Sequence, residues 1–253
     1  MALTPPPDPF YADPLLAACY DTLDGSREDL DHYEAIVAEL GARRVVDLGC
    51  GTGSLAVRLA ASGLQVIGVD PAAASLSLAR AKERALSAGA GPITWIHADA
   101  TGIGAQEADL AVMTGNVAQV FTTDASWEVT LRGLREALRE GGHLVFEARR
   151  PERRAWEEWQ VEHDAGAWRT YDVPGVGVVR TRPRRLVAEP PLVTFTDEFA
   201  LPDGRILSST STLRFRTEEE LRSTVEAECF AVLEVREAPD RPGREHVVIA
   251  RAI

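Results

Sequence analysis

The sequence predicts a doubly wound α/β fold, in which helices cover both faces of a mostly parallel sheet. Two observations predict it: five strand-like segments alternate with helical segments over residues 44–150, and a glycine-rich turn follows the first of these strands. Strands that are joined through helices have right-handed crossovers and lie parallel. Two more strand-like segments end the chain as a hairpin, so we expect a seven-stranded sheet whose last strand is antiparallel.

The helices follow from apolar spacing and from helix-breaking residues. Apolar residues recur with helical spacing from Leu15 to Leu40, and Asp24-Gly25-Ser26 divides this segment into two helices. Pro71 suits the first turn of a helix, which we expect to run to about Ser87. The predicted alternation is strand 44–49, helix 54–63, strand 65–70, helix 71–87, strand 93–99, strand 108–116, helix 126–140 and strand 143–149.

A β-rich insertion begins after Arg150. We expect a short helix over 151–162, followed by strands over 168–216 that include a hairpin at Asp203-Gly204. A helix restarts after Thr217, which forms a predicted capping box with Glu220. The expected division is an N-terminal helical cap (1–43), the core (44–150), an inserted antiparallel β layer (151–216) and a C-terminal helix and hairpin that complete the core (217–253).

Composition disfavours several classes of partner. The net charge of −12 opposes binding to nucleic acid or to an anionic membrane. The three cysteines, Cys19, Cys50 and Cys229, lack the close spacing of a metal site or a redox pair, so we expect no metal and a reduced, cytoplasmic setting. No apolar run reaches about eighteen residues, and no signal-peptide pattern is present, so we expect neither membrane spanning nor secretion.

The stretch VVDLGCGTGSLAVRLA (residues 45–60) places Gly49, Gly51 and Gly53 between a strand and a helix. We call residues 49–53 the glycine turn. Glycine lacks the Cβ that would keep a ligand away from the backbone, and it permits positive φ. The first amides of the following helix also point their donors at a ligand. A tight turn alone needs one glycine, so three glycines predict that a nucleotide-type ligand lies against the backbone.

The pattern departs from the dinucleotide fingerprint G-x-G-x-x-G, because Ser54 stands where the third glycine would fall. Asp47, two residues before the first glycine, would repel a pyrophosphate and attract the cationic end of a ligand. The motif DLGCGTG instead resembles the first motif of the class I S-adenosylmethionine-dependent methyltransferases, which have a Rossmann-like fold. The resemblance covers residues 45–149 well and the flanking segments loosely.

This resemblance implies where S-adenosylmethionine would bind. Asp70 ends the second strand about twenty residues beyond the turn, where a carboxylate accepts both ribose hydroxyls. Asp99 ends the third strand, where the family places the adenine amino group, and Asn116 ends the fourth, where the family faces the reactive methyl. Helix capping or turn formation is the alternative explanation for each of these residues.

Aromatic residues before the first strand also match small-molecule members of the family, in which they close over the cofactor. Tyr20 and Tyr33 are the matching positions, and anchoring of a helix on the core explains them equally well. The complete set of predicted cofactor-binding residues is Asp47, Gly49, Cys50, Gly51, Gly53, Asp70, Pro71, Asp99, Ala100, Asn116, Tyr20 and Tyr33.

Methyl transfer from a sulfonium is an in-line displacement that releases a neutral thioether and needs no acid. Alignment of the reactants can contribute roughly 7–11 kcal/mol, and a base that removes an acceptor proton contributes roughly 10²–10⁴-fold. Glu147 ends the fifth strand with Arg149 on the same side, so both are predicted to face the substrate, with a structural ion pair as the alternative. His32 is the third catalytic candidate, and a solvated surface histidine is its alternative.

The insertion resembles a subgroup of this family. Bacterial small-molecule methyltransferases, including sugar N-methyltransferases of natural-product pathways, carry an antiparallel layer at this place. Trp156 and Trp159 share one helix face and would floor a pocket, pack a lid or form the seam of a homodimer. Several arginines suggest either an anionic substrate group or solvated strand edges. These arginines are Arg180, Arg182, Arg184 and Arg185.

The sequence therefore predicts S-adenosylmethionine-dependent N- or O-methylation of a small molecule, and three alternatives remain. An NAD-linked oxidoreductase would share the sheet, but none of the four tyrosines has a lysine four residues later, as the usual short-chain dehydrogenase pair requires. A protein that binds the cofactor without turnover is the second alternative. RNA methylation is disfavoured by the charge and by the lack of an appended RNA-binding module.

Overall fold

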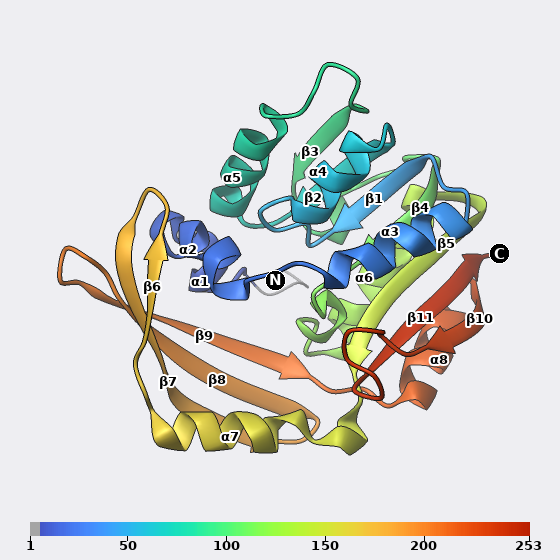
Figure 1. Ribbon diagram of the computed structural model, residues 1–253. Coiled ribbons are helices and arrows are strands. Elements are labelled where there is room, and N and C mark those ends of the chain that lie inside the picture. Colours follow the sequence, from blue (N-terminus) through green and yellow to red (C-terminus); the bar gives the residue numbers. More distant parts are fainter. Residues whose placement is uncertain (1–5) are drawn as a thin grey trace.

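Seven strands form the core sheet of the chain. They are β1 (Arg44–Leu48), β2 (Gln65–Asp70), β3 (Ile93–His97), β4 (Ala108–Met113), β5 (Leu138–Arg149), β10 (Phe230–Arg236) and β11 (Glu245–Ala252). Their order in the sheet is β10-β11-β5-β4-β1-β2-β3, and the pairs are parallel except that β11 is antiparallel to β5 and β10. The computed structural model describes residues 6–253, so the first five residues of the predicted N-terminal cap lie outside it. The predicted seven-stranded sheet with an antiparallel last strand is confirmed (Figure 1).

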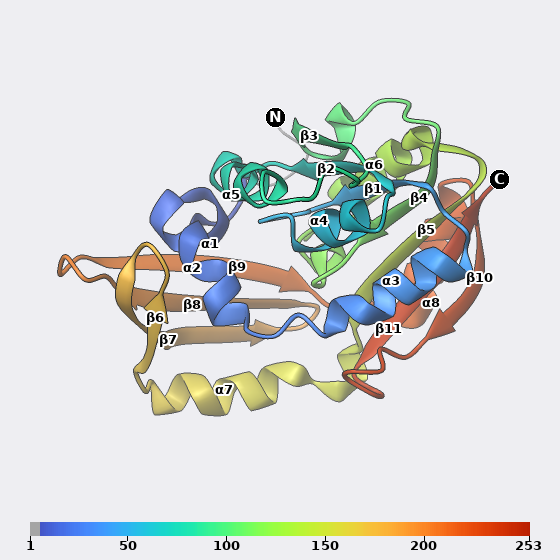
Figure 2. The same cartoon turned by 45° about the horizontal axis from the view of Figure 1, so that its top comes forward.

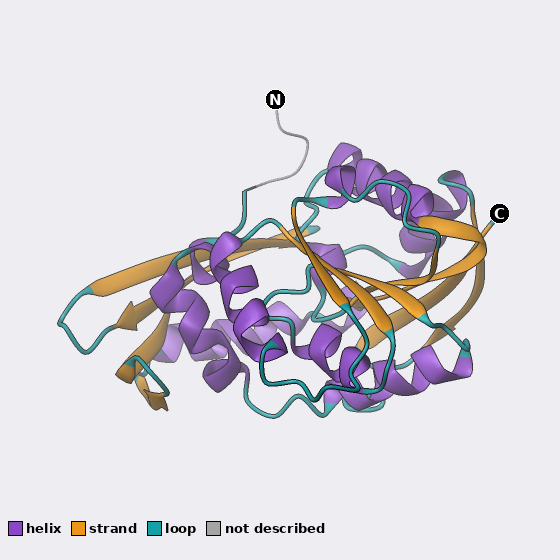
Figure 3. Cartoon of the chain, turned by 90° about the horizontal axis from the view of Figure 1, so that it is seen from above, coloured by secondary structure: helices purple, strands orange, loops and turns teal. Residues whose placement is uncertain are grey.

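Helices cover both faces of the core sheet, as Figure 3 shows from above. These helices are α3 (Asp29–Glu39), α4 (Ser54–Ala61), α5 (Ala73–Glu83), α6 (Asp124–Ala137) and α8 (Glu218–Ala227). One buried apolar cluster joins the sheet to α6 and α8 through Trp127 and Leu221. A second cluster joins it to α3 and α4 through Ile36 and Leu55. The layers form because each helix buries one apolar stripe against the central strands, which are apolar on both faces.

The predicted boundaries of several helices are wrong. The helix expected over 151–162 is a 3-10 turn, Pro151–Arg153, followed by α7 (Ala155–Ala165). The helix expected over 71–87 is α5, which begins at Ala73 because the Asp70 carboxylate accepts a hydrogen bond from the Ala72 amide (2.7 Å) and holds Ala72 extended. The helix expected to end at residue 140 is α6, which ends at Ala137. The backbone at Leu138 is extended and pairs with β4, so β5 begins earlier than predicted.

A second, antiparallel sheet, here called the inserted sheet, follows the core. It contains β6 (Arg169–Val173), β7 (Gly177–Glu189), β8 (Leu192–Ala200) and β9 (Ile206–Arg214), in that order. The helix α7 (Ala155–Ala165) packs against it through Trp156, whose ring meets Phe215 edge-on with centroids 4.8 Å apart. The inserted antiparallel layer and its hairpin at Asp203-Gly204 are confirmed.

Two short helices, α1 (Pro9–Ala12) and α2 (Pro14–Asp24), lie between α5 and the inserted sheet (Figure 2), and we call them the cover. Cys19 of α2 packs against Val173 and Val179 of the inserted sheet. Phe10 of α1 stacks on Phe199 of β8, with ring centroids 5.1 Å apart. The cover therefore links the two sheets. Its helix α2 and the core helix α3 are the two helices that the spacing of residues 15–40 predicts.

Within residues 6–253, every helix is too short or too polar to cross a bilayer. The same residues hold no group of three or more His, Cys, Asp or Glu side chains that could bind a metal ion.

The capping box at the start of α8 is confirmed and makes a stability prediction. Thr217 Oγ1 accepts a hydrogen bond from the Glu220 amide (3.1 Å), and the Glu220 carboxylate accepts one from the Thr217 amide (2.7 Å). Thr217→Ala is expected to lower the free energy of unfolding by about 1 kcal/mol, because a helix amide loses its partner. Urea denaturation measures this change. Ser223→Ala, at an exposed position of α8, is the control and should stay within about 0.5 kcal/mol of the parent; equal effects of both changes would contradict the capping role.

Candidate active site

The glycine turn joins β1 to α4 through left-handed backbone. Its three glycines, Gly49, Gly51 and Gly53, have φ of 73°, 53° and 78°. A Cβ at Gly49 would lie 2.6 Å from Val117, and one at Gly53 would lie 2.7 Å from Trp95. A Cβ at Gly51 would meet nothing within 4 Å. Packing therefore requires glycine at the first and third positions, whereas Gly51 leaves the backbone open to a ligand.

Asp70 ties the end of β2 to this turn. Its carboxylate accepts hydrogen bonds from the amides of Gly51 (2.8 Å) and Ala72 (2.7 Å). Burial raises the pKa of Asp70, and the two amide donors partly oppose this shift. The carboxylate thus holds the middle of the glycine turn at a fixed distance from the carboxyl end of β2.

Asp47, near the end of β1, is a buried carboxylate whose hydrogen bonding is incomplete. Its side chain is 1% exposed, and among the described residues Oδ1 has no hydrogen-bond partner. Burial and the neighbouring Asp70 carboxylate together raise its pKa to about 7, although Arg27 and a hydrogen bond from the Ala56 amide partly oppose this shift. Because leaving a buried polar atom unpaired is costly, a cationic donor from a ligand would satisfy this atom.

A cavity of about 510 Å³ opens beside these carboxylates, within the size range of small-molecule sites. It lies between the glycine turn, the cover and the edge of the inserted sheet. Among the predicted cofactor residues, its lining includes Tyr20, Asp47, Gly49, Cys50, Gly51, Asp70, Pro71, Asp99 and Ala100. The carboxyl ends of the first three strands thus contribute side chains to one cavity, as expected for a doubly wound sheet.

The remaining predicted site residues do not line this cavity. They are Gly53, Tyr33, Asn116, Glu147, Arg149 and His32. Gly53 is turned toward Trp95 and Ala79 by its place in the turn. Asn116 lies in a loop whose neighbours Gly115 and Val117 do line the cavity, so its backbone is close to the site although its side chain turns away.

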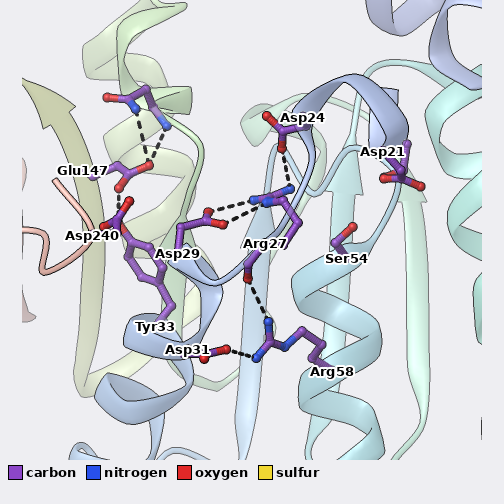
Figure 4. A network of polar contacts seen from close by, with 12 residues as sticks. Asp21, Asp24, Arg27, Asp29, Asp31, Tyr33, Ser54, Arg58, Glu147 and Asp240 are labelled. Carbon is purple, nitrogen blue, oxygen red and sulfur yellow. Dashed lines mark hydrogen bonds and ion pairs between the residues drawn. The ribbon is translucent and has the colours of Figure 1, made fainter. Parts of the chain in front are cut away.

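Glu147 is buried in a polar network behind the cavity (Figure 4). Its carboxylate accepts hydrogen bonds from the hydroxyl of Tyr33 and from the amide of Asn116 (2.9 Å). The Asn116 side chain in turn donates to Glu245 (3.0 Å), a second buried carboxylate. Burial and the charge of Glu245 together raise the pKa of Glu147 to about 7, although the hydrogen bonds from Tyr33 and Asn116 partly oppose this shift. Glu147 therefore contacts the loop after β4 and not the cavity.

Arg149 and His32 also have partners away from the cavity. Arg149 Nη1 donates to Gln119 (3.0 Å), and the guanidinium lies 5.2 Å above the ring centre of Trp159. Burial lowers the pKa of Arg149, with Glu245 opposing. His32 packs against Tyr33, and burial and Arg236 lower its pKa. Its Nε2 is buried without a hydrogen-bond partner in the described chain. Neither residue therefore lines the cavity.

The arginines of the insertion are engaged outside the cavity. Arg182 and Arg184 both pair with Glu198, at 2.6 and 3.2 Å. Arg180 and Arg182 also lie over the ring of Trp168, at 5.1 and 4.5 Å. None of the four predicted arginines lines the cavity. These contacts account for Arg180, Arg182 and Arg184 without an anionic substrate group.

Sequence reasoning missed several residues that line the cavity. Tyr11 comes from the cover, and Arg27 comes from the loop before α3, where it pairs with Asp24 (3.1 Å) and Asp29 (3.0 Å), as Figure 4 shows. No local motif marks these positions, because helix packing alone brings them to the glycine turn. The edge of the inserted sheet adds a further group of lining residues, namely Leu192, Thr210 and Thr212.

Comparison with known proteins agrees with this geometry. Residues 45–142 match the family model of a methyltransferase domain. A curated relative from Geobacillus sp. (strain WCH70) that carries the name of a methyltransferase is 56% identical over 45 residues. That match spans 18% of this chain and 18% of the relative, so it supports the domain and not the whole protein.

Solved structures show the fold over nearly the whole chain. The CcbJ methyltransferase from Streptomyces caelestis has a TM-score of 0.73 at 21% identity, covering 100% of this chain and 99% of that one. CalS10, an amino pentose methyltransferase from Micromonospora echinaspora solved with S-adenosylmethionine bound, has a TM-score of 0.66 at 21% identity, covering 93% and 95%. A Clostridium acetobutylicum methyltransferase has a TM-score of 0.70 at 17% identity, covering 91% and 93%.

The chain thus has the fold of the class I S-adenosylmethionine-dependent methyltransferases, and residues 45–142 match a methyltransferase domain. The predicted resemblance to this class is confirmed.

The different roles of the turn glycines predict different mutational effects. Gly53→Ala is expected to lower the free energy of unfolding by about 2 kcal/mol or more, because left-handed strain adds to a clash with Trp95 and Ala79. Gly51→Ala, the matched control, keeps the strain but meets open space, so its cost should stay near 1 kcal/mol. Chemical denaturation of both variants measures these changes in the free energy of unfolding. A larger decrease for Gly51→Ala than for Gly53→Ala would contradict the different roles of the two glycines.

Glu147 predicts a dependence of stability on pH. Its pKa is about 7 in the folded chain against an ordinary 4.5, so the folded chain binds more protons than the unfolded chain between these values. The free energy of unfolding therefore falls as pH rises through this window. Glu147→Gln is expected to reduce that fall, as measured by urea denaturation at pH 4.5, 6 and 7.5. The exposed Glu226→Gln is the control; an unchanged slope in Glu147→Gln would contradict the raised pKa.

Proposed function

We propose that this protein transfers a methyl group from S-adenosylmethionine to the nitrogen or oxygen of a small-molecule acceptor. The observation that carries the proposal is the unpartnered Oδ1 of buried Asp47, beside a left-handed glycine turn that opens onto a cavity of about 510 Å³. A pyrophosphate would leave this carboxylate unsatisfied and repelled, whereas the ammonium of an amino acid would satisfy it. The site therefore suits a cofactor with a cationic amino-acid tail.

The other lining residues suit the remaining parts of the same cofactor. Asp70 is a buried carboxylate that can accept hydrogen bonds from the ribose hydroxyls. Asp99 and Ala100, after the end of β3, line the part of the cavity where adenine is expected. Tyr20 and Tyr11 close the cavity from the side of the cover. When bound, the cofactor supplies a methyl group on a sulfonium that departs as a neutral thioether. The residues of the chain hold and align the reactants and exclude water.

We further propose that Glu147 positions the loop after β4 and does not act as a base. It fixes the amide of Asn116 from behind, while Thr114, Gly115 and Val117 of the same loop line the cavity. The structure offers the three catalytic candidates no contact with the cavity, so orientation in a dry site is the main contribution that the geometry supports. Arg149 joins the same scaffold through Gln119.

Several further assignments belong to this proposal. A small molecule fits the enclosed cavity, and the net charge of −12 disfavours a nucleic acid acceptor. The proposed division into a cap, a core, an inserted layer and a C-terminal segment that completes the core has boundaries at residues 43, 150 and 216, and the start of β1 at Arg44, the end of β5 at Arg149 and the start of α8 at Glu218 support it. The proposal also includes a homodimer that forms through the inserted sheet. It further includes a cytoplasmic location, which is favoured by the free thiols of Cys19, Cys50 and Cys229.

Calorimetry with S-adenosylmethionine, S-adenosylhomocysteine and NAD⁺ tests the cofactor. The first two are expected to bind and the third is not. Methyl transfer is then measured with labelled donor against amines, phenols and carboxylates. Aminated sugars come first because a solved structure with this fold belongs to an amino pentose methyltransferase. Binding of NAD⁺ without S-adenosylhomocysteine would overturn the proposal, and tight donor binding without transfer to any acceptor would favour a non-catalytic binding protein.

Asp70→Asn is expected to weaken S-adenosylhomocysteine binding by about 10- to 100-fold, the loss associated with hydrogen bonds to a charged group. The Gly51 and Ala72 amides donate to different carboxylate oxygens, so the single amide oxygen of the variant keeps only one of these two bonds, and thermal unfolding checks that the variant stays folded. Calorimetry measures the change in dissociation constant. Asp172→Asn, at an exposed position of the inserted sheet, should leave it unaltered; an unchanged constant in Asp70→Asn would remove the ribose assignment.

A further inference from the structure

The only lysine of the chain lies at the junction between the cover and the glycine turn. Lys82 is near the end of α5, and its Nζ lies 2.7 Å from an oxygen of Asp21, 2.9 Å from Thr52 Oγ1 and 3.0 Å from Ser54 Oγ. An ammonium carries three donors and no acceptor. Each of the three donors of Lys82 therefore has one acceptor within reach.

The three acceptors come from three different elements. Asp21 belongs to α2 of the cover, Thr52 belongs to the glycine turn, and Ser54 is the first residue of α4. Thr52 Oγ1 also donates to the second oxygen of Asp21, at 2.6 Å, which closes a ring of hydrogen bonds between the cover and the turn. Lys82 thus joins α5, the cover and both ends of the segment that bends around Gly53.

These contacts lie at the rim of the cavity. Thr52 and Ser54 line it, and Tyr20, the neighbour of Asp21 on α2, lines it from the opposite side. Within residues 6–253, Lys82 and Asp21 form the one ion pair between α2 and α5, and Asp24 at the end of α2 pairs with Arg27 of the next loop. The cover and the glycine turn are therefore fastened to each other at the place where a ligand in the cavity meets both.

An exposed ion pair alone contributes little to stability, because water screens it. The side chains of Lys82 and Asp21 are 30% and 44% exposed, so the arrangement depends on Thr52, which is only 3% exposed and hydrogen-bonds to both of them. Shared hydrogen bonds of this kind strengthen one another and are lost together when the central group is removed. Loss of the ammonium would therefore loosen the junction, because it leaves the hydrogen bond from Thr52 to Asp21 and the apolar contacts of α2 with the inserted sheet as the remaining contacts of this segment.

We propose that Lys82 is a positioning residue that fastens the cover to the glycine turn and thereby slows the escape of the cofactor from the cavity. This inference rests on the proposed function, since it assigns the ligand of the cavity. It does not give Lys82 a contact with the reacting atoms, so the rate of the chemical step should not depend on it.

The test compares Lys82→Met, which keeps the length of the side chain and removes the cation, with Arg84→Met, which removes an exposed cation beyond the end of α5. Amide hydrogen exchange over residues 14–24, measured without ligand, reports on the cover itself. Stopped-flow dissociation of S-adenosylhomocysteine and steady-state methyl transfer report on the consequence. Thermal unfolding of the ligand-free variants checks that the fold is retained.

Lys82→Met is expected to exchange faster over residues 14–24 and to release S-adenosylhomocysteine about tenfold faster, a change equivalent to about 1.4 kcal/mol. The KM for the donor should rise with kcat unchanged, and Arg84→Met should match the parent. Unchanged exchange over residues 14–24 would overturn the fastening, whatever the ligand data. Faster exchange with unchanged dissociation would overturn the retention of cofactor. If the parent chain binds no S-adenosylhomocysteine, the proposed function fails, and hydrogen exchange still decides whether Lys82 fastens the cover.

Discussion

The site depends on one short hydrogen bond, from the amide of Gly51 to the carboxylate of Asp70 (2.8 Å). This bond joins the end of β2 to the middle of the turn that follows β1, so the two parallel strands present their carboxyl ends as one surface. It also fixes the turn in a left-handed conformation that only glycine adopts without strain. The amides of Gly49 and Cys50 also donate to the Val69 carbonyl (2.8 and 3.2 Å), and together these bonds place the turn beside the cavity and the buried Asp47.

Much of the fold could be predicted from the sequence, because its signals are local. The alternating apolar segments predicted the number of strands in the core sheet, and Asp203-Gly204 predicted the hairpin. Thr217 and Glu220 predicted where the helix α8 begins. Errors occurred where a tertiary contact overrides a local preference. Pro71 suits the first turn of a helix, yet the bond from Ala72 to Asp70 delays that helix by two residues.

The site could be predicted in part. The strand ends that carry Asp47, Asp70 and Asp99 were found because parallel strands bring their carboxyl ends together. The orientation of Glu147 could not be found, because its partners Tyr33 and Asn116 are distant in sequence and only the packed structure shows that they surround it. The cavity-lining residues of the cover and the inserted sheet were missed for the same reason: no periodicity or motif encodes a contact between segments so far apart.

The cover has a consequence for the order in which the chain assembles. Cys19 and Phe10 find their apolar partners in Val173 and Phe199, which a ribosome adds long after the N-terminal helices have emerged. Contacts between such distant segments form late in folding, because a long loop must first be closed. A nascent chain that has already completed β1 to β4 therefore still has a ligand cavity that the cover does not enclose. The cover can close the cavity only after the last third of the protein has been synthesised.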